Sequence, residues 1–159
     1  MKKIFVSILF LMGIFSLSQN KSEQFIKILE EEKMAHLLYS QFYDLYQTRP
    51  FEMIRLSEIR HFNSLKSKLL NQDIPCESIV LDDETFQNNE IKALYNKFKA
   101  QGKSSEQDAL KIGKWIEEED IKELEKIIEV ATNELKPVLQ QLIYASQNHL
   151  EAFNKHINN

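Results

Sequence analysis

The chain has 159 residues, of which only 3 are glycine and 3 are proline, and this scarcity of turn residues argues against a sheet protein. Hydrophobic residues make up 43% of the chain, which excludes a disordered protein, and a single cysteine excludes an internal disulfide and a cysteine-based zinc cluster. The formal charge is −4 and no long basic cluster is present, so nucleic-acid binding is not expected. Composition therefore indicates one helical, globular domain.

Residues 1–18 have the pattern of a secretory signal peptide. Two lysines precede an apolar run that ends at Leu17, and serines occupy positions −3 and −1 of a cleavage point before Gln19. The run is shorter than the roughly 20 apolar residues that a membrane span needs. We therefore expect an exported protein, periplasmic or secreted, with its mature domain at residues 19–159 and no membrane association after cleavage. An uncleaved anchor is the alternative.

Helical spacing of apolar residues predicts four long helices and one short helix in the mature domain. The long helices are expected over residues 21–47, over residues 50–70, from Ser104 to just before Thr132, and after Asn133. The short helix is expected near residues 89–100, inside the long connection between the second and third long helices. Short connections make the other neighbours antiparallel, whereas the long one allows a crossover. This is the topology of a ferritin-like up-down four-helix bundle.

Each long helix carries ionisable residues where its apolar spacing predicts a buried position, and residues three apart share one helix side. These residues are, in chain order, Glu32, Glu58, His61, Glu117, Asp120 and His149. Burying an unpaired carboxylate costs several kcal/mol, and no lysine or arginine falls clearly on the same faces. We therefore expect divalent metal, with two ions as one possibility. Carboxylates with some imidazole suit iron or manganese.

The predicted ligand set departs from the usual di-iron pattern, in which two helices each supply a Glu and two each supply Glu-x-x-His. One Glu-x-x-His is complete, at Glu58-Ile-Arg-His61, but the second has serine in its first position, at Ser146-Gln-Asn-His149. Asp120 lies three residues after Glu117, so we expect its carboxylate to replace the missing one.

Taken singly, the same features have simpler explanations. An isolated Glu-x-x-His on a helix is usually solvated, and the acidic runs at residues 30–32 and 117–120 are typical of solvated helix faces. A lone histidine at position 149 would be an ordinary core or surface residue. The remaining candidates are expected outside the site: His36 and His156 on the surface, Tyr39 and Trp115 in packing, and Cys76 as an exposed thiol, with intermolecular pairing as its alternative.

Four segments carry a further signal: Glu30-Glu31-Glu32-Lys33-Met34-Ala35, Ser57-Glu58-Ile59-Arg60-His61, Ile116-Glu117-Glu118-Glu119-Asp120-Ile121 and Ser146-Gln147-Asn148-His149-Leu150. They resemble a prokaryotic family of ferritin-like proteins, the domain of unknown function family 2202. The first two helices are also similar to rubrerythrins, because Glu32 precedes Ala35 by three residues and Tyr39 by seven, as a rubrerythrin ligand does. This resemblance selects Glu32 over its two neighbours and implies the fold and metal binding.

Three functions are compatible with these patterns. The first is a di-metal oxidoreductase that acts on peroxide, dioxygen or Fe(II); no catalytic residue is assigned. The second is metal storage or a structural metal site without catalysis. The third is a helical interaction module with a degenerate, empty site. The oligomeric state stays open, with a homodimer as one candidate.

Overall fold

The computed structural model describes the backbone of residues 3–158 and the side chains of residues 21–158. All side chains of the expected signal peptide, residues 1–18, lie outside this range, so its identification stays a prediction. The described part holds five α-helices and no strand, which confirms the expected all-α fold. The helices are α1 (Lys3–Tyr46), α2 (Arg49–Leu70), α3 (Asn89–Gln101), α4 (Glu106–Val130) and α5 (Lys136–Ile157). Helix α1 therefore begins before the predicted residue 21; no proline interrupts the preceding segment.

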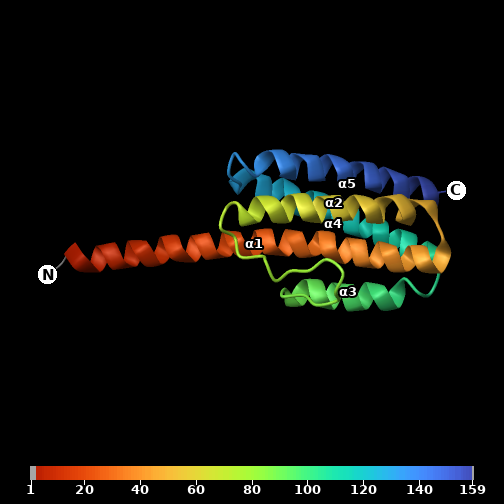
Figure 1. Cartoon of the computed structure of the whole chain (residues 1–159), viewed down its shortest axis with the longest axis horizontal. Coiled ribbons are helices and arrows are strands. Elements are labelled where there is room, and N and C mark those ends of the chain that lie inside the picture. Colours follow the sequence, from red (N-terminus) through yellow and green to blue (C-terminus); the bar gives the residue numbers. More distant parts are fainter. Residues whose placement is uncertain (1–2, 159) are drawn as a thin grey trace.

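The four long helices lie side by side, with α3 on the outside (Figure 1). Short connections make α1 antiparallel to α2 and α4 antiparallel to α5. Residues 71–88 and α3 carry the chain back along the bundle, so that α4 starts at the same end as α2. Helix α3 then packs on α1 and α4. The long crossover therefore places two helical hairpins against each other.

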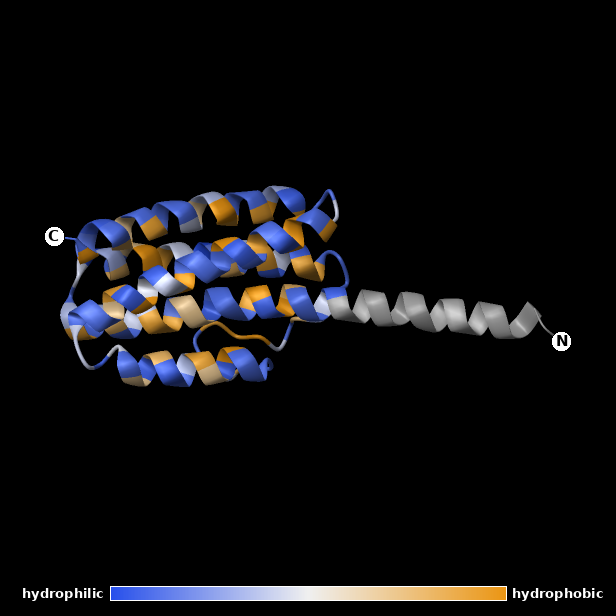
Figure 2. Cartoon of the chain, turned by 180° about the vertical axis from the view of Figure 1, so that it is seen from behind, coloured by the Kyte–Doolittle hydropathy of each residue, from blue (hydrophilic) through white to orange (hydrophobic). Residues whose placement is uncertain are grey.

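Apolar side chains form two separate clusters along the bundle, while polar residues dominate its outer surface (Figure 2). The first cluster takes its α1 residues from Phe25 to Leu29, and the second takes them from Met34 to Phe42. On each of the other three long helices, too, a stretch without apolar cluster residues separates the residues of the first cluster from those of the second. The ionisable residues predicted to be buried fall between the clusters on every long helix. We call this region the polar layer.

Two buried charges on α1 hold the connection between α2 and α3. The Lys33 ammonium donates to Asp83 Oδ1 at 2.5 Å and to the Thr85 carbonyl at 2.7 Å. The Glu30 carboxylate accepts from the backbone amides of residues 87 and 88 at 2.6 and 2.8 Å. Both side chains belong to fully buried residues. The interpretation of residues 30–32 as a solvated face is therefore wrong, and Lys33 points away from the polar layer.

Two further residues expected on the surface are buried. Cys76 is 0% exposed and packs within the first apolar cluster, so the prediction of an exposed thiol is wrong. Burial raises the pKa of this thiol, although Lys66 acts in the opposite direction. His36 is 8% exposed, and its Nδ1 lies 2.9 Å from the Arg55 carbonyl oxygen. Intermolecular pairing of Cys76 would require the connection at residues 71–88, which contains it, to leave the first apolar cluster.

Gly113 allows α4 to approach the aromatic ring of Phe153, because an added Cβ would lie 2.5 Å from two ring carbons. We predict that Gly113→Ala lowers the free energy of unfolding by about 1–2 kcal/mol. Overpacking costs about 1–3 kcal/mol, and the better helix propensity of alanine returns up to about 1 kcal/mol. Urea denaturation measures the change. A double-mutant cycle with Phe153→Leu should show coupling between the two sites; additive effects would contradict the packing argument.

Candidate metal centre

The six predicted site residues lie together in the polar layer. Their exposed fractions are small: the carboxylate residues are at most 8% exposed, and both histidine side chains are 11% exposed. Each long helix contributes at least one of them, and α2 and α4 each contribute two, whose i, i+3 spacing keeps both groups on the inward side. The acidic run at residues 117–120 is consequently not solvated at its two ends. We call this set the carboxylate–histidine centre: Glu32, Glu58, His61, Glu117, Asp120 and His149.

Two three-residue groups within the centre have the spacing needed to hold a metal ion, since one ligand atom from each member lies within 4.8 Å of the others. The first group is Glu32, Glu58 and His61, and the second is Glu58, Glu117 and His149. Glu58 belongs to both, and its two oxygens face different rings. Its Oε2 lies 2.9 Å from His61 Nδ1, and its Oε1 lies 2.9 Å from His149 Nδ1.

Each imidazole also contacts a second carboxylate. His61 Nδ1 lies 3.3 Å from Glu32 Oε2, and His149 Nδ1 lies 3.4 Å from Glu117 Oε2. The two rings are stacked, with centroids 5.5 Å apart and planes inclined by 21°. Each ring therefore directs its Nδ1 at the shared carboxylate and at one carboxylate of its own helical hairpin.

Several atoms of the centre lack a hydrogen-bond partner among the described residues. They are Glu32 Oε1, Glu58 Oε1, Asp120 Oδ1 and His149 Nδ1. The 2.9 Å approach of His149 Nδ1 to Glu58 Oε1 is close, but it lacks the alignment of a hydrogen bond. Leaving a buried polar group unpaired costs about 1–3 kcal/mol. These residues fit a cation, because three carboxylate oxygens of the centre are buried without a protein donor.

Asp120 lies outside both three-residue groups but next to the incomplete motif on α5. Its Oδ2 accepts a hydrogen bond of 2.5 Å from Ser146 Oγ, and its Oδ1 has no partner among the described residues. The carboxylate of α4 therefore lies against the α5 position at which the serine stands. This placement agrees with the expectation that Asp120 replaces the carboxylate missing at position 146. The role of Asp120 as a metal ligand stays a prediction.

Two hydroxyl groups support the centre from outside. The Tyr39 hydroxyl donates to Glu117 Oε1 at 2.7 Å, and Ser57 Oγ lies 3.2 Å from His61 Nε2. Partners of this kind orient ligand side chains. Tyr39 is fully buried, as expected of a packing residue, but sequence reasoning missed its hydrogen bond. The available signal was its position seven residues after Glu32, which places both on one face of α1.

The carboxylates raise the pKa values of the two imidazoles. Burial lowers the pKa of His61, but Glu32 and Glu58 outweigh burial and raise it to about 11. Burial likewise opposes the effect of Glu117 and Glu58 on His149, whose pKa rises to about 9. Without a metal ion, both rings therefore carry a proton at neutral pH. Metal coordination requires a neutral imidazole, so metal binding should release protons.

The pKa values of the four carboxylates shift in different directions, although all four groups are buried in the same layer. Burial raises the pKa of Glu32, Glu117 and Asp120. Burial acts in the same direction on Glu58, but the two imidazoles outweigh it and hold the pKa of Glu58 below its usual range. Beside the centre, burial raises the pKa of Glu31 to about 7. The charge of the metal-free centre is therefore only partly balanced by its own residues.

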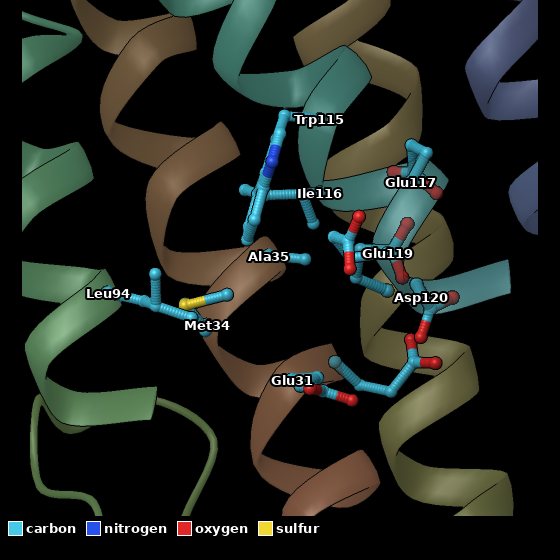
Figure 3. Close-up of a pocket in the computed structure, with 11 residues that line it drawn as sticks. Glu31, Met34, Ala35, Leu94, Trp115, Ile116, Glu117, Glu119 and Asp120 are labelled. Atoms are coloured by element: carbon cyan, nitrogen blue, oxygen red, sulfur yellow. The ribbon is translucent and has the colours of Figure 1, made fainter. Parts of the chain in front are cut away.

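A cavity of about 30 Å³ lies beside the centre, between α1 and α4 (Figure 3). Apolar side chains occupy one side of it, and carboxylates occupy the other. The apolar residues are Met34, Ala35, Leu94, Trp115 and Ile116. The space is sufficient for about one or two water molecules. Trp115 packs against Phe98 with ring centroids 5.0 Å apart, and it also lines this cavity.

We predict that the metal-free protein loses stability as pH rises from about 6.5 to 9. Because the folded-state pKa of each imidazole exceeds the ordinary value of 6.5, its stabilising contribution is complete below pH 6.5 and decreases as pH approaches about 9 and 11. The loss should exceed about 1 kcal/mol, the free energy of one pKa unit. Urea denaturation at several pH values measures it. The His61→Gln/His149→Gln variant should flatten the dependence, whereas His156→Gln should retain it; an equal slope in both variants would contradict the assignment.

Comparison with known proteins identifies relatives over most of the chain. The sequence profile described as "Uncharacterized protein domain (DUF2202)" matches residues 21–159. The uncharacterized protein MJ0754 of Methanocaldococcus jannaschii is 37% identical over 146 residues, which cover 90% of this chain and 78% of that protein. The crystal structure of hypothetical protein MJ0754 is similar with a TM-score of 0.81 at 37% identity, covering 87% of this chain and 79% of that chain. The chain therefore belongs to the DUF2202 family.

Proposed function

We propose that this protein is an exported, ferritin-like oxidoreductase that holds two iron or manganese ions between its long helices and acts on peroxide, dioxygen or Fe(II). The observation that carries the proposal is the pair of carboxylate–imidazole groups that share Glu58. The two helical hairpins and the long crossover between them support the ferritin-like assignment.

The two groups divide the ligands between two ions. Glu32 and His61 would hold one ion, Glu117 and His149 would hold the other, and Glu58 would contact both. Bound iron or manganese would supply electrons to a small oxidant, one from each ion. The Tyr39 hydroxyl keeps Glu117 oriented through its hydrogen bond, and the apolar clusters on either side exclude bulk water.

The donor atoms favour iron or manganese over metals that prefer thiolate. The centre combines carboxylate oxygens with imidazole nitrogens, and Cys76 belongs to the first apolar cluster rather than to the centre. Oxygen-rich sites of this type suit Mn and Fe, whereas thiolate ligands select Cu(I), Zn or iron–sulfur clusters.

A non-catalytic role is the second candidate function. In this role the centre stores metal, serves as a structural site, or is a degenerate site within an interaction module. The contact of His61 with Glu58 at 2.9 Å favours the degenerate site, because it partly balances charge without metal. Ser146, which stands in place of a carboxylate, favours it as well.

Export is part of the proposal and rests on the signal-peptide pattern of residues 1–18. Among the residues that the structure describes, none of the helices is both long and apolar enough to cross a bilayer. A homodimer remains one candidate for the assembly.

We predict that Mn(II), or Fe(II) without oxygen, raises the melting temperature of the protein. Binding to the folded state at 100 times the dissociation constant adds about 2.7 kcal/mol, which corresponds to roughly 5–10 °C for a domain of this size. Glu117→Gln should lose most of this shift. The matched control is Glu118→Gln, because the side chain of Glu118 is 40% exposed. Calorimetry measures the shift, and metal analysis should find two ions per chain.

The metal-dependent rise in melting temperature also tests whether Asp120 is a ligand. Asp120→Asn should weaken metal binding at least about tenfold, a typical loss for a residue that supports a metal site. Anomalous diffraction from Mn(II)-loaded crystals locates the ions directly. A melting temperature that ignores both metals would contradict the metal proposal and favour the degenerate site.

Catalysis is tested by turnover. With excess Fe(II) as the electron donor, iron-loaded protein should reduce hydrogen peroxide or dioxygen and oxidise that Fe(II) at a rate proportional to protein concentration, and Glu58→Gln should abolish this activity because both ions lose their shared ligand. Peroxide electrodes, oxygen electrodes and Fe(III) absorbance give the three rates. Metal binding without any of these activities would support the non-catalytic role instead.

A further inference from the structure

The outer side of helix α5 carries no formal charge over most of its length. The run from Pro137 to Leu150 contains no Asp, Glu, Lys or Arg, although charged residues make up 28% of the chain. We call the exposed residues of this run the α5 face: Pro137, Gln140, Gln141, Tyr144, Gln147 and Asn148. Tyr144 lies in the middle of the face and is 67% exposed. A large aromatic side chain therefore stands in water among uncharged neighbours.

The opposite side of the bundle differs from the α5 face in cover and in charge. Helix α3 packs there on α1 and α4, whereas α5 packs on α2 and α4 (Figure 1). On α4, Lys122 pairs with Glu119 at 2.6 Å, and Lys126 pairs with Glu123 at 2.8 Å. Since the chain has a formal charge of −4, two copies repel each other in general. The α5 face is where they can approach without bringing like charges together.

Helix α2 extends this weakly charged surface. A groove between α2 and α5 is lined on the α2 side by Asn63, Ser64, Ser67 and Lys68. Beyond its first turn, the exposed charged residues of α2 are Arg60 and Lys68, and both are positive. The surface formed by α2 and α5 therefore lacks the acidic groups that give the chain its net negative charge.

The chemistry of the α5 face is complementary to a copy of itself. Glutamine and asparagine amides each carry a donor and an acceptor, so two such faces can hydrogen-bond to each other. The centres of protein interfaces are depleted of charged residues and enriched in tyrosine. An acidic or a basic partner would find no opposite charge on this face, whereas a second copy of the chain meets the same uncharged groups.

The charges at the two ends of α5 select the direction in which two copies pair. Lys136 lies eight residues before Tyr144 and Glu151 lies seven residues after it, which places both about 11–12 Å from Tyr144 along the helix. A two-fold axis across the helices at Tyr144 makes the two α5 helices antiparallel and brings Lys136 beside Glu151 of the second copy. An axis along the helices would instead bring Lys136 onto Lys136. Antiparallel pairing therefore matches opposite charges.

Both end charges are available for such a pairing. Lys136 and Glu151 are exposed, and neither forms an ion pair with another described residue of the chain. The next charges outward are Glu134 and Lys155, and antiparallel pairing brings these opposite charges near each other as well.

The surface is large enough for a specific dimer. Helices α2 and α5 have 22 residues each, so both are about 33 Å long. Two helices packed side by side present a surface about 20 Å wide. Each copy therefore offers about 650 Å², and a dimer buries about 1,300 Å², which exceeds the roughly 1,000 Å² expected of a biological interface.

We infer that two copies of this chain form an antiparallel dimer through the α5 face, with Tyr144 at the two-fold axis. The inference assigns the surface and the direction of the homodimer. It does not depend on the proposed metal chemistry, because none of the residues of the α5 face belongs to the carboxylate–histidine centre.

The first test measures the size of the purified protein by sedimentation velocity. The protein should be a dimer at about 50 μM, above the micromolar dissociation constants of weak interfaces. Tyr144→Glu should weaken the dimer at least about hundredfold, because it brings two like charges together at the axis. The matched control is Val130→Glu, since Val130 is a 46% exposed apolar residue of α4 outside the α5 face; it should leave the dimer intact.

The second test exchanges the end charges and examines the direction of pairing. Lys136→Glu and Glu151→Lys should each weaken the dimer about three- to tenfold, as expected for exposed ion pairs that occur twice in a dimer. The double variant should restore the dissociation constant to within about twofold of the native value. Lys126→Glu on α4 is the control and should have no effect. Single variants without effect, or a double variant weaker than both, would contradict antiparallel pairing.

The outcomes separate this inference from the proposed function. A native protein that sediments as a monomer at about 50 μM would overturn the inference, and so would a dimer that Tyr144→Glu leaves intact. Because Tyr144 is mostly exposed, Tyr144→Glu should keep the native circular dichroism spectrum and the Mn(II)-dependent rise in melting temperature. A native dimer whose melting temperature ignores both metals would defeat the proposed function and leave this inference standing.

Discussion

The central constraint on this molecule is the burial of four carboxylates in one layer of a helical bundle. An isolated charge taken from water into a protein interior costs several kcal/mol, and a domain of this size has a total stability of only about 5–15 kcal/mol. The two apolar clusters on either side keep water away from the polar layer. Compensating positive charge must therefore lie within the layer itself. Among the described residues, the two imidazoles are the groups that provide it, since no lysine or arginine forms an ion pair with the six members of the centre.

The fold meets this constraint by pairing two similar hairpins. In each hairpin the first helix supplies a carboxylate and the second supplies a histidine: Glu32 with His61, and Glu117 with His149. The residue three positions before the histidine differs, because α2 has Glu58 and α5 has Ser146. The hydrogen bond from Ser146 to Asp120 brings a carboxylate of α4 to the second position. The crossover between the hairpins aligns them so that one shared carboxylate contacts both rings.

Periodicity in the sequence was sufficient to locate the helices and the polar layer, because both depend on which residues share a helix face. It was insufficient for residues that face the connection at 71–88, which has no periodic pattern. Glu30 and His36 lie on α1 outside the apolar spacing, which suggested solvent, but the connection or the neighbouring helix covers them. Cys76 lies in the connection itself, where spacing carries no information about burial.

Charge balance distinguishes a metal site from a network of ion pairs. Four ionised carboxylates with two protonated imidazoles leave two negative charges uncompensated inside the bundle, so a metal-free centre must also keep some carboxyl groups protonated. The raised pKa values of Glu32 and Asp120 agree with that requirement. Two divalent ions with neutral imidazoles balance four carboxylates completely, and they also satisfy lone pairs that no protein donor reaches, such as those of Glu32 Oε1 and Asp120 Oδ1. The metal-bound state therefore removes both the charge imbalance and the unpaired atoms, whereas protonation removes only the first.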